Sequence, residues 1–212
     1  NASVLSMSYD DRNTFVSVLP PHHSYEITCG HLAIMDLGAQ IFINDSLKHV
    51  LKNFKSFQPN ALMLVPLFVE TMHKKIWEEV RKKGMEKQMR MLIKMNSVLL
   101  TFHLDVRSKL FRQVNRAFGG NLKSIVCGGA PLSPDLIKDF YAFGITVLEG
   151  YGITECAPLV AVNSPGKVKF HSVGTPVKGC MVRIDKTPGE ETGEILVHGD
   201  NVMMGYYKNE EA

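Results

Sequence analysis

Short apolar runs alternate with segments of helical periodicity from residue 14 to residue 148. The runs are rich in β-branched and large apolar side chains, as buried strands are, and lie at residues 14–19, 38–43, 61–65, 124–127 and 145–148. Apolar positions spaced by three and four residues predict helices at 25–36, 47–57 and 134–143, and a long helical segment over 66–118 that Gly84 breaks. This alternation predicts an α/β fold, with a largely parallel sheet flanked by helices.

Capping residues precede two of these helices. Asp45 and Ser46 can cap the helix whose apolar face begins at Leu47, and Ser133 can cap the helix that begins at Pro134. We therefore expect both helices to start with a side-chain hydrogen bond.

Two glycine-bearing segments follow apolar runs. Residues 128–132 read GGAPL, and residues 149–155 read EGYGITE, which we expect to leave the strand at 145–148 as a turn. The carboxyl ends of parallel strands are where open α/β sheets bind ligands, so the two segments could wall one nucleotide pocket. The hydroxyl of Thr154 and the carboxylate of Glu155 could supply oxygen ligands to Mg²⁺. Taken alone, a Gly-x-Gly segment is more typical of an ordinary strand-to-loop turn.

The last forty residues differ in pattern. Two β-type runs at 182–184 and 194–197 are separated by the turn residues Pro188 and Gly189. We expect residues 1–172 to belong to the α/β domain and residues 173–212 to open a smaller β-rich subdomain.

Composition excludes several classes of protein. The chain has 212 residues, is 45% hydrophobic and carries a net charge of +3, so it can bury a sizeable core and has no strong overall attraction to nucleic acid. Its four cysteines lack the spacing of a zinc site and are expected to be reduced thiols. No apolar run reaches the roughly 20 residues of a membrane helix, which favours a cytoplasmic protein, with peripheral contact at the inner membrane surface left open.

Basic residues concentrate between residues 74 and 94. This segment holds eight Lys and Arg residues and three Glu residues. A solvated helix face is the commoner explanation, and docking to an anionic membrane or a polyanion is the alternative.

Five segments in this order resemble the adenylate-forming superfamily of acyl-CoA synthetases, peptide-synthetase adenylation domains and luciferases. They read LPPHHSYE (19–26), GGAPL (128–132), EGYGITE (149–155), VGTPVKG (173–179) and GEILVHGDNVMMGYY (193–207). Within that superfamily, residues 59–70 and the long helical segment before GGAPL most resemble long-chain fatty acyl-CoA ligases.

The resemblance implies a reaction and a set of roles. A fatty carboxylate would be joined to the α-phosphorus of ATP, releasing pyrophosphate, and the acyl group would pass to coenzyme A. Glu155 matches the Mg²⁺ ligand of the family and Thr154 a hydroxyl that contacts phosphate. The implied binding residues of ATP or AMP are Gly128, Gly129, Ala130, Glu149, Gly150, Tyr151, Gly152 and Thr154.

The acyl group is assigned to a second set of residues. By the same resemblance His23 lies near the acyl carboxylate and the α-phosphate, and Gly150 borders the acyl tunnel. Without the motif, His23 is more simply a loop histidine that caps a backbone group.

Parts of the family pattern are not found in the sequence. The phosphate loop, the ribose-binding Asp and the catalytic Lys of the C-terminal domain have no counterpart, so the chain looks like a piece of a longer protein and is expected to be inactive alone. Two other functions stay open: an adenylating enzyme that acylates a carrier-protein thiol, and a non-catalytic module that docks to membrane or polyanion through residues 74–94.

Overall fold

A seven-stranded sheet covered by helices on both faces forms the body of the molecule. The computed structural model describes residues 9–209. The strands of the large sheet are β1 (Thr14–Ser17), β2 (Gln40–Ile43), β3 (Ala61–Leu64), β4 (Ser124–Cys127), β5 (Thr146–Gly152), β6 (Leu159–Val162) and β7 (Thr175–Pro176). Their order across the sheet is β2-β1-β3-β4-β5-β6-β7, with parallel pairs from β2 to β5 and antiparallel pairs beyond β5. The predicted α/β fold with a largely parallel sheet is confirmed.

Helices connect the parallel strands. They are η1 (Glu26–Leu32), α2 (Ala33–Asp36), α3 (Val50–Phe57), α4 (Pro66–Lys82), α5 (Glu86–Thr101), α6 (Arg107–Leu110), α7 (Arg112–Ala117), α8 (Pro134–Ala142) and the short 3₁₀ helix η2 (Thr154–Cys156). Gly84 separates α4 from α5 with a φ of 65°, a left-handed conformation that glycine adopts without steric cost. The predicted break at this residue is therefore confirmed.

The two faces of the large sheet bury two different cores, because side chains alternate along each strand. Val16, Leu62 and Ile125 point to the face covered by α3, α4, α7 and α8. Phe15 and Val126 point to the other face, which η1 and α2 cover. Helices on both faces explain why β3 and β4 are buried at every position.

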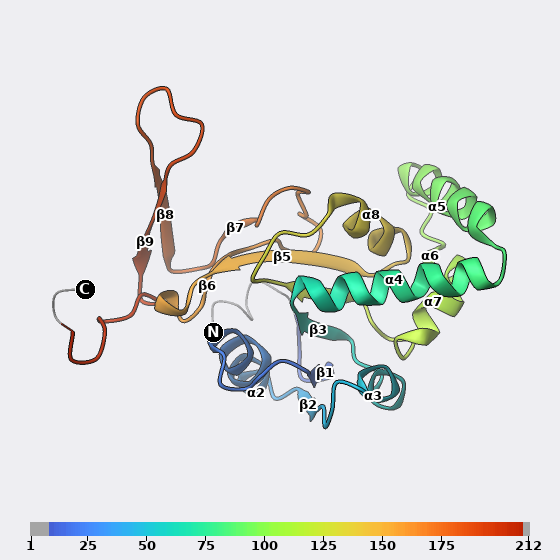
Figure 1. Cartoon of the computed structure of the whole chain (residues 1–212), viewed down its shortest axis with the longest axis horizontal. Helices are drawn as coiled ribbons and strands as arrows, with labels where there is room; N and C mark the ends of the chain where they lie inside the picture. The colour runs from blue at the N-terminus through green and yellow to red at the C-terminus, as the bar shows by residue number, and fades with distance from the viewer. Residues whose placement is uncertain (1–8, 210–212) are drawn as a thin grey trace.

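A separate hairpin follows the large sheet. Strands β8 (Cys180–Asp185) and β9 (Glu194–Gly199) pair antiparallel from Cys180 opposite Gly199 to Asp185 opposite Glu194, which confirms the predicted β runs. Figure 1 shows the hairpin standing off one end of the molecule, with α5 at the other end. Because β7 belongs to the large sheet, the second sheet begins at Cys180. The domain division at residue 172 stays a prediction, and its parts at 1–8 and 210–212 lie outside the described residues.

The predicted start of α3 was wrong. The helix begins at Val50, and Leu47 precedes it with 67% of its surface exposed. Asp45 accepts a hydrogen bond from Asn53 and pairs with His49 at 2.7 Å, so its carboxylate holds a turn instead of capping the helix. Ser133 does occupy the residue before α8, but its side chain makes no capping hydrogen bond.

The helix predicted at 25–36 is present, but its Glu26–Leu32 part is a π-helix. Its wider turn places the fully buried carboxyl group of Glu26 against Gly30, where a Cβ atom would lie 2.8 Å from the Glu26 Cδ. A side chain larger than hydrogen at residue 30 would occupy the space of that carboxyl group. π-Helical turns are rare and occur frequently at functional sites.

All four cysteines, Cys29, Cys127, Cys156 and Cys180, are buried free thiols, as expected. Burial raises the pKa of the Cys29 thiol to about 12. Within residues 9–209, none of the helices combines the length and apolar character needed to cross a bilayer.

Candidate active site

Three of the sequence motifs meet at the carboxyl edge of the parallel strands. The hydroxyl of Tyr25, in the segment after β1, donates a hydrogen bond of 3.1 Å to the carbonyl oxygen of Val126 in β4. A Cβ atom on Gly128 would lie 3.7 Å from the carbonyl oxygen of Gly150 and 3.8 Å from the Tyr25 ring. The segment after β1, the GGAPL segment and β5 therefore pack directly against one another, as the rule for parallel sheets predicts.

A side-chain contact joins the first motif to the last part of EGYGITE. The hydroxyl oxygens of Ser24 and Thr154 are 3.1 Å apart, and 130 residues of chain separate them. Ser24 is half-buried and Thr154 is exposed at this edge. The contact brings residues 19–26 and 149–155 together, and the roles expected of their side chains stay a prediction.

His23 is exposed beside this contact and already performs one local task. Its Nδ1 accepts a hydrogen bond of 3.1 Å from the backbone N–H of Tyr25. The capping role considered for a loop histidine is therefore observed. Because a neutral imidazole carries one proton, this hydrogen bond assigns the proton to Nε2, which is free to donate to an anionic oxygen.

Glu149 connects the two glycine-bearing segments. Its Oε1 accepts a hydrogen bond of 3.3 Å from the backbone N–H of Leu132. Gly129 lies in the loop between β4 and α8 with a φ of 95°, a backbone conformation that residues other than glycine rarely adopt. Ala130, the next residue, is exposed. The backbone of residues 128–130 thus lines an open edge next to Glu149.

The turn expected at Glu149–Gly152 is not present. Strand β5 continues to Gly152, pairing with β4 up to Glu149 and with β6 from Gly150. Gly152 is required because a Cβ atom there would overlap the carbonyl oxygen of Pro158. Gly152 therefore allows a close approach between two segments of the chain itself.

Tyr151 lies in the same strand, half-buried against the core on the η1 side of the sheet. The chain leaves β5 after Gly152 and passes through Ile153 into η2, which carries Thr154 and Glu155. Because the strand extends to Gly152, Tyr151 lies within β5, and Thr154 and Glu155 lie in the short helix that follows it.

Glu155 is held by the segment that follows the hairpin. Its Oε1 accepts a hydrogen bond of 2.8 Å from the Tyr206 hydroxyl, and its carbonyl oxygen accepts one of 2.8 Å from the backbone N–H of Met203. The hydrogen bond from Tyr206 lowers the pKa of Glu155, and Glu155 in turn raises the pKa of Tyr206. Glu155 is therefore ionised at neutral pH.

The donor set fits Mg²⁺ held together with a substrate. Within the described part of the chain, no three His, Cys, Asp or Glu side chains gather as a complete protein ligand set. Mg²⁺ is commonly bound through one or two carboxylates, with water and substrate phosphates completing the shell. The ionised carboxylate of Glu155 and the neighbouring Thr154 hydroxyl meet that lesser requirement.

Sequence reasoning missed three residues at this edge. Ser24 and Tyr206 lie inside the motifs given above. Their contacts join residues that are far apart in the sequence, so no sequence spacing predicts them. Glu26 accepts a hydrogen bond from Ser17, and its second carboxyl oxygen has no partner among the described residues. Burial raises the pKa of Glu26. An acid on the buried side of an apolar helix was the signal that could have identified it.

Comparisons with known proteins agree with the motifs. The family model described as AMP-binding enzyme matches residues 1–207. A long-chain-fatty-acid–CoA ligase, FadD15, of Mycobacterium bovis is 39% identical over 103 residues, which are 49% of this chain and 16% of that protein. The peroxisomal long chain acyl-CoA synthetase 7 of Arabidopsis thaliana is 27% identical over 217 residues, covering 94% of this chain and 31% of that protein. The chain thus spans less than a third of the length of these relatives.

Solved structures share the fold. The anthranilate CoA ligase AuaEII in complex with anthranoyl-AMP superposes with a TM-score of 0.71 at 17% identity, covering 99% of this chain and 36% of that one. The o-succinylbenzoate coenzyme A synthetase of Bacillus subtilis, in complex with ATP and magnesium ion, gives a TM-score of 0.68 at 20% identity, covering 99% and 37%. With a family model that matches nearly its whole length, the chain belongs to the AMP-binding enzyme family.

Proposed function

We propose that the protein containing this chain is an ATP-dependent fatty acid–CoA ligase. Its first step would form a bond between a carboxylate oxygen of the fatty acid and the α-phosphorus of ATP, and break the bond from that phosphorus to the bridging oxygen of pyrophosphate. In the second step the sulfur of coenzyme A would form a bond to the acyl carbon as the bond from that carbon to the phosphate oxygen of AMP breaks, and the thiol proton would pass to solvent. The names of the relatives, which include long-chain-fatty-acid–CoA ligases, support this substrate class.

The observation that carries the proposal is the contact between Ser24 and Thr154 at 3.1 Å. It brings the exposed imidazole of His23 and the hydroxyl and carboxylate of Thr154 and Glu155 to the same edge. The first step gathers negative charge on phosphate oxygens, so fixed donors and a cation are what the protein must provide. One edge of the sheet can supply both.

Each of these side chains then has a task. Nε2 of His23 donates to an oxygen of the carboxylate or the α-phosphate, because Nδ1 is occupied by the Tyr25 N–H. Thr154 donates its hydroxyl proton to a phosphate oxygen. Glu155 holds Mg²⁺, which would neutralise part of the triphosphate charge when bound.

The remaining residues bind the nucleotide and the acyl chain. The ring of Tyr151 lies against adenine, and the backbone of Gly128–Ala130 forms a wall of the adenine site beside Glu149. Gly150 borders the acyl group, a role that the resemblance of EGYGITE to the family motif supports.

Substitution of Glu155 tests the proposal in the enzyme that contains this chain. Glu155→Gln keeps the size of the side chain and removes the charge. We expect fatty-acid-dependent pyrophosphate release to fall about 10²-fold or more, the loss typical of one missing electrostatic stabiliser. Thioester formation from supplied acyl-adenylate should fall much less, because pyrophosphate has already left by then.

Glu191→Gln is the matched control, since Glu191 is an exposed acid in the loop that joins β8 and β9. It should leave both half-reactions unchanged. An equal loss in both half-reactions of Glu155→Gln at saturating Mg²⁺ would contradict the assigned role. A ladder of acetate, octanoate and hexadecanoate, each offered with coenzyme A or a carrier protein, tests the substrate and the acceptor separately.

A further inference from the structure

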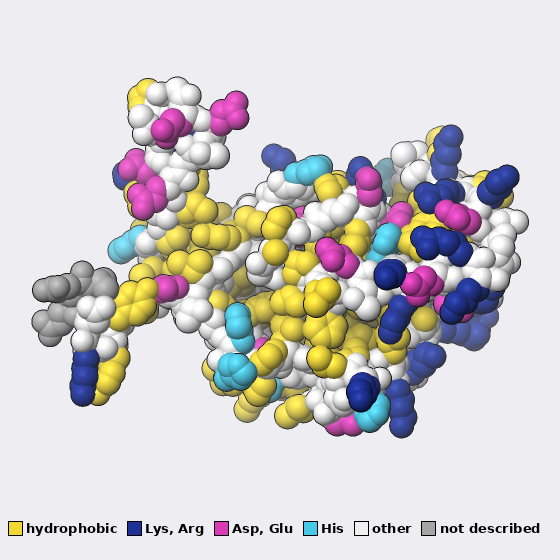
Figure 2. Space-filling view, viewed as in Figure 1, with side chains coloured by type: hydrophobic (Ala, Val, Ile, Leu, Met, Phe, Trp, Pro, Cys, Tyr) yellow, Lys and Arg dark blue, Asp and Glu magenta, His cyan; other side chains and the backbone are white. Residues whose placement is uncertain are grey.

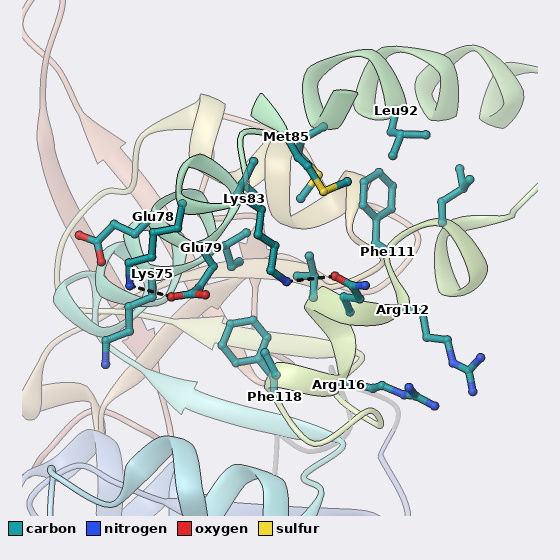
Figure 3. Close-up of a pocket in the computed structure, with 18 of the residues that line it drawn as sticks. Lys75, Glu78, Glu79, Lys83, Met85, Leu92, Phe111, Arg112, Arg116 and Phe118 are labelled. Atoms are coloured by element: carbon teal, nitrogen blue, oxygen red, sulfur yellow. Dashed lines mark hydrogen bonds and ion pairs between the residues drawn. The ribbon is translucent and has the colours of Figure 1, made fainter. Parts of the chain in front are cut away.

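A hollow lies away from the candidate active site, lined by none of its residues. It has a volume of about 860 Å³ and opens between the last half of α4, the start of α5, the α6–α7 segment and α3. Figure 3 shows the rings of Phe111 and Phe118 and the side chains of Met85 and Leu92 around it. A hollow of this size is within the range of small-molecule sites, which are about 300–1,000 Å³.

Chain direction places this hollow at the opposite edge of the sheet. Helix α4 begins at Pro66, directly after the carboxyl end of β3, and lines the hollow only from Lys75 onward. Phe118 and the end of α7 lie just before the amino end of β4. The hollow is therefore at the amino edge of the parallel strands, and the motif residues are at the carboxyl edge.

The floor of the hollow is apolar. Ile76 and Val114 are buried and line it together with Phe111 and Phe118, each of which is 2% exposed. The four side chains come from α4 and the α6–α7 segment, so packing between helices forms the floor. A floor of this kind receives an aliphatic chain better than a nucleotide or a polyphosphate, because the polar groups of those ligands would be buried without partners.

The rim of the hollow is basic. Seven Lys and Arg side chains and two Glu side chains line it, a net formal charge of +5: Lys55, Lys75, Lys82, Lys83, Lys109, Arg112, Arg116, Glu78 and Glu79. Lys82 pairs with Glu79 at 2.9 Å, and the other six bases make no ion pair within residues 9–209. Figure 2 shows Lys and Arg gathered at this end of the molecule, over α4 and α5.

We propose that this hollow, which we call the basic-rimmed cavity, binds an amphipathic anion with a single long aliphatic chain and an anionic head. The apolar floor takes the chain, and the unpaired bases take the head, since long basic side chains cover apolar surface with their stems while their charges stay in water. A neutral lipid would leave the bases without a partner, and a small inorganic anion would leave the floor empty. The inference does not depend on the proposed ligase activity, because the two sites lie at opposite edges.

Trp77 makes this binding measurable in the 212-residue chain. It is the single tryptophan of the sequence and follows Ile76, which lines the cavity. Bromine on an acyl chain quenches tryptophan fluorescence at short range, and Trp77 is the helical neighbour of the lining residues Ile76 and Glu78, so we expect brominated hexadecanoate to quench Trp77 with saturation. Brominated hexadecanol and inorganic phosphate serve as probes that carry only the chain or only the charge.

Two charge-matched variants separate the cavity from general attraction. Lys109→Glu, Arg112→Glu and Arg116→Glu together reverse three bases of the rim. Lys48→Glu, Lys169→Glu and Lys186→Glu together make the same change of charge at exposed positions elsewhere. All six substituted residues are exposed, so we expect both variants to fold normally, and circular dichroism checks this.

We expect the rim variant to weaken hexadecanoate binding about tenfold or more and the control variant to leave it within about twofold, since three charge contacts are lost in one and none in the other. Filling the floor by Val114→Phe should also weaken binding, with no change of charge. Equal weakening in both charge variants, equal quenching by hexadecanol, or quenching that appears only when the acid is presented in anionic vesicles would each overturn the proposal.

Discussion

Gly152 offers a sharp test of how the EGYGITE segment is built. A Cβ atom on this residue would overlap the carbonyl oxygen of Pro158, and that oxygen accepts a hydrogen bond of 2.9 Å from the N–H of Ile153. Gly152→Ala must therefore move the backbone at Pro158 or Ile153. The backbone conformation of Gly152 itself is not left-handed, so the conflict is steric alone.

The expected cost follows from overpacking and the hydrogen bond together. Forcing an extra methyl group into a packed position costs about 1–3 kcal/mol, and a lost hydrogen bond adds about 0.5–1.5 kcal/mol. For a chain of this size, 1 kcal/mol shifts Tm by about 2–4 °C. Gly152→Ala should therefore lower Tm by roughly 3–18 °C.

Gly150→Ala is the matched control, two residues earlier in the same strand. The nearest atoms to its Cβ position are 3.5 Å away, an ordinary van der Waals contact. Alanine also restricts the unfolded chain more than glycine, so Tm should stay constant or rise slightly. Thermal unfolding of both variants followed by circular dichroism decides the matter. If Gly152→Ala unfolds with the parent, or if both variants lose the same stability, the steric account of Gly152 is wrong.

Other residues of the site give three further predictions. Tyr206→Phe removes the hydrogen bond that lowers the pKa of Glu155, so an NMR titration should find that pKa shifted upward toward its ordinary value; an unchanged titration would mean that the hydrogen bond does not form in solution. Glu26 has a raised pKa because it is buried, so stability present below its unfolded pKa of about 4.5 is lost as pH rises through the folded value. Glu26→Gln cannot ionise, and its Tm should decline less than that of the parent between about pH 4 and pH 7; parallel curves would refute the assignment. His23→Ala in the whole enzyme should depress adenylate formation with little change in Tm, because the side chain is exposed, and a large fall in Tm with normal adenylation would instead indicate a structural role.

The sequence pattern predicted the buried part of the fold well. Runs of apolar residues covered on both faces, such as Ala61–Leu64 and Ser124–Cys127, have no alternative to a central strand, and the break at Gly84 follows from its backbone freedom. Both depend on local chemistry that a single segment carries. The same is true of the hairpin, where turn residues separate two β-type runs.

Predictions failed where a specific side-chain contact or a strand pairing overrides the local pattern. Leu47 fits the apolar face of a helix, but the bond between Asp45 and His49 holds it in a turn. The two glycines of EGYGITE favour a turn locally, and pairing with β6 instead continues the strand through Gly152. For the site, the motifs identified the residues at the carboxyl edge, while Ser24 and Tyr206 could be found only once the chain was folded.

The hydrogen bonds between Glu155 and the segment after β9 have a consequence for protein engineering: the base of the β8–β9 hairpin should not be altered, but its tip can be. At its base, Asn201 donates hydrogen bonds to the carbonyl oxygens of Cys156 and Leu159, and the N–H of Met203 donates one to the carbonyl oxygen of Glu155. These bonds anchor the segment after β9 to η2 and β6, so its length cannot change freely. At its tip, residues 186–192 are exposed and make no backbone hydrogen bond to the motif edge. A fluorophore or affinity tag inserted beside Gly189 would therefore extend into solvent and leave the geometry of Glu155 undisturbed.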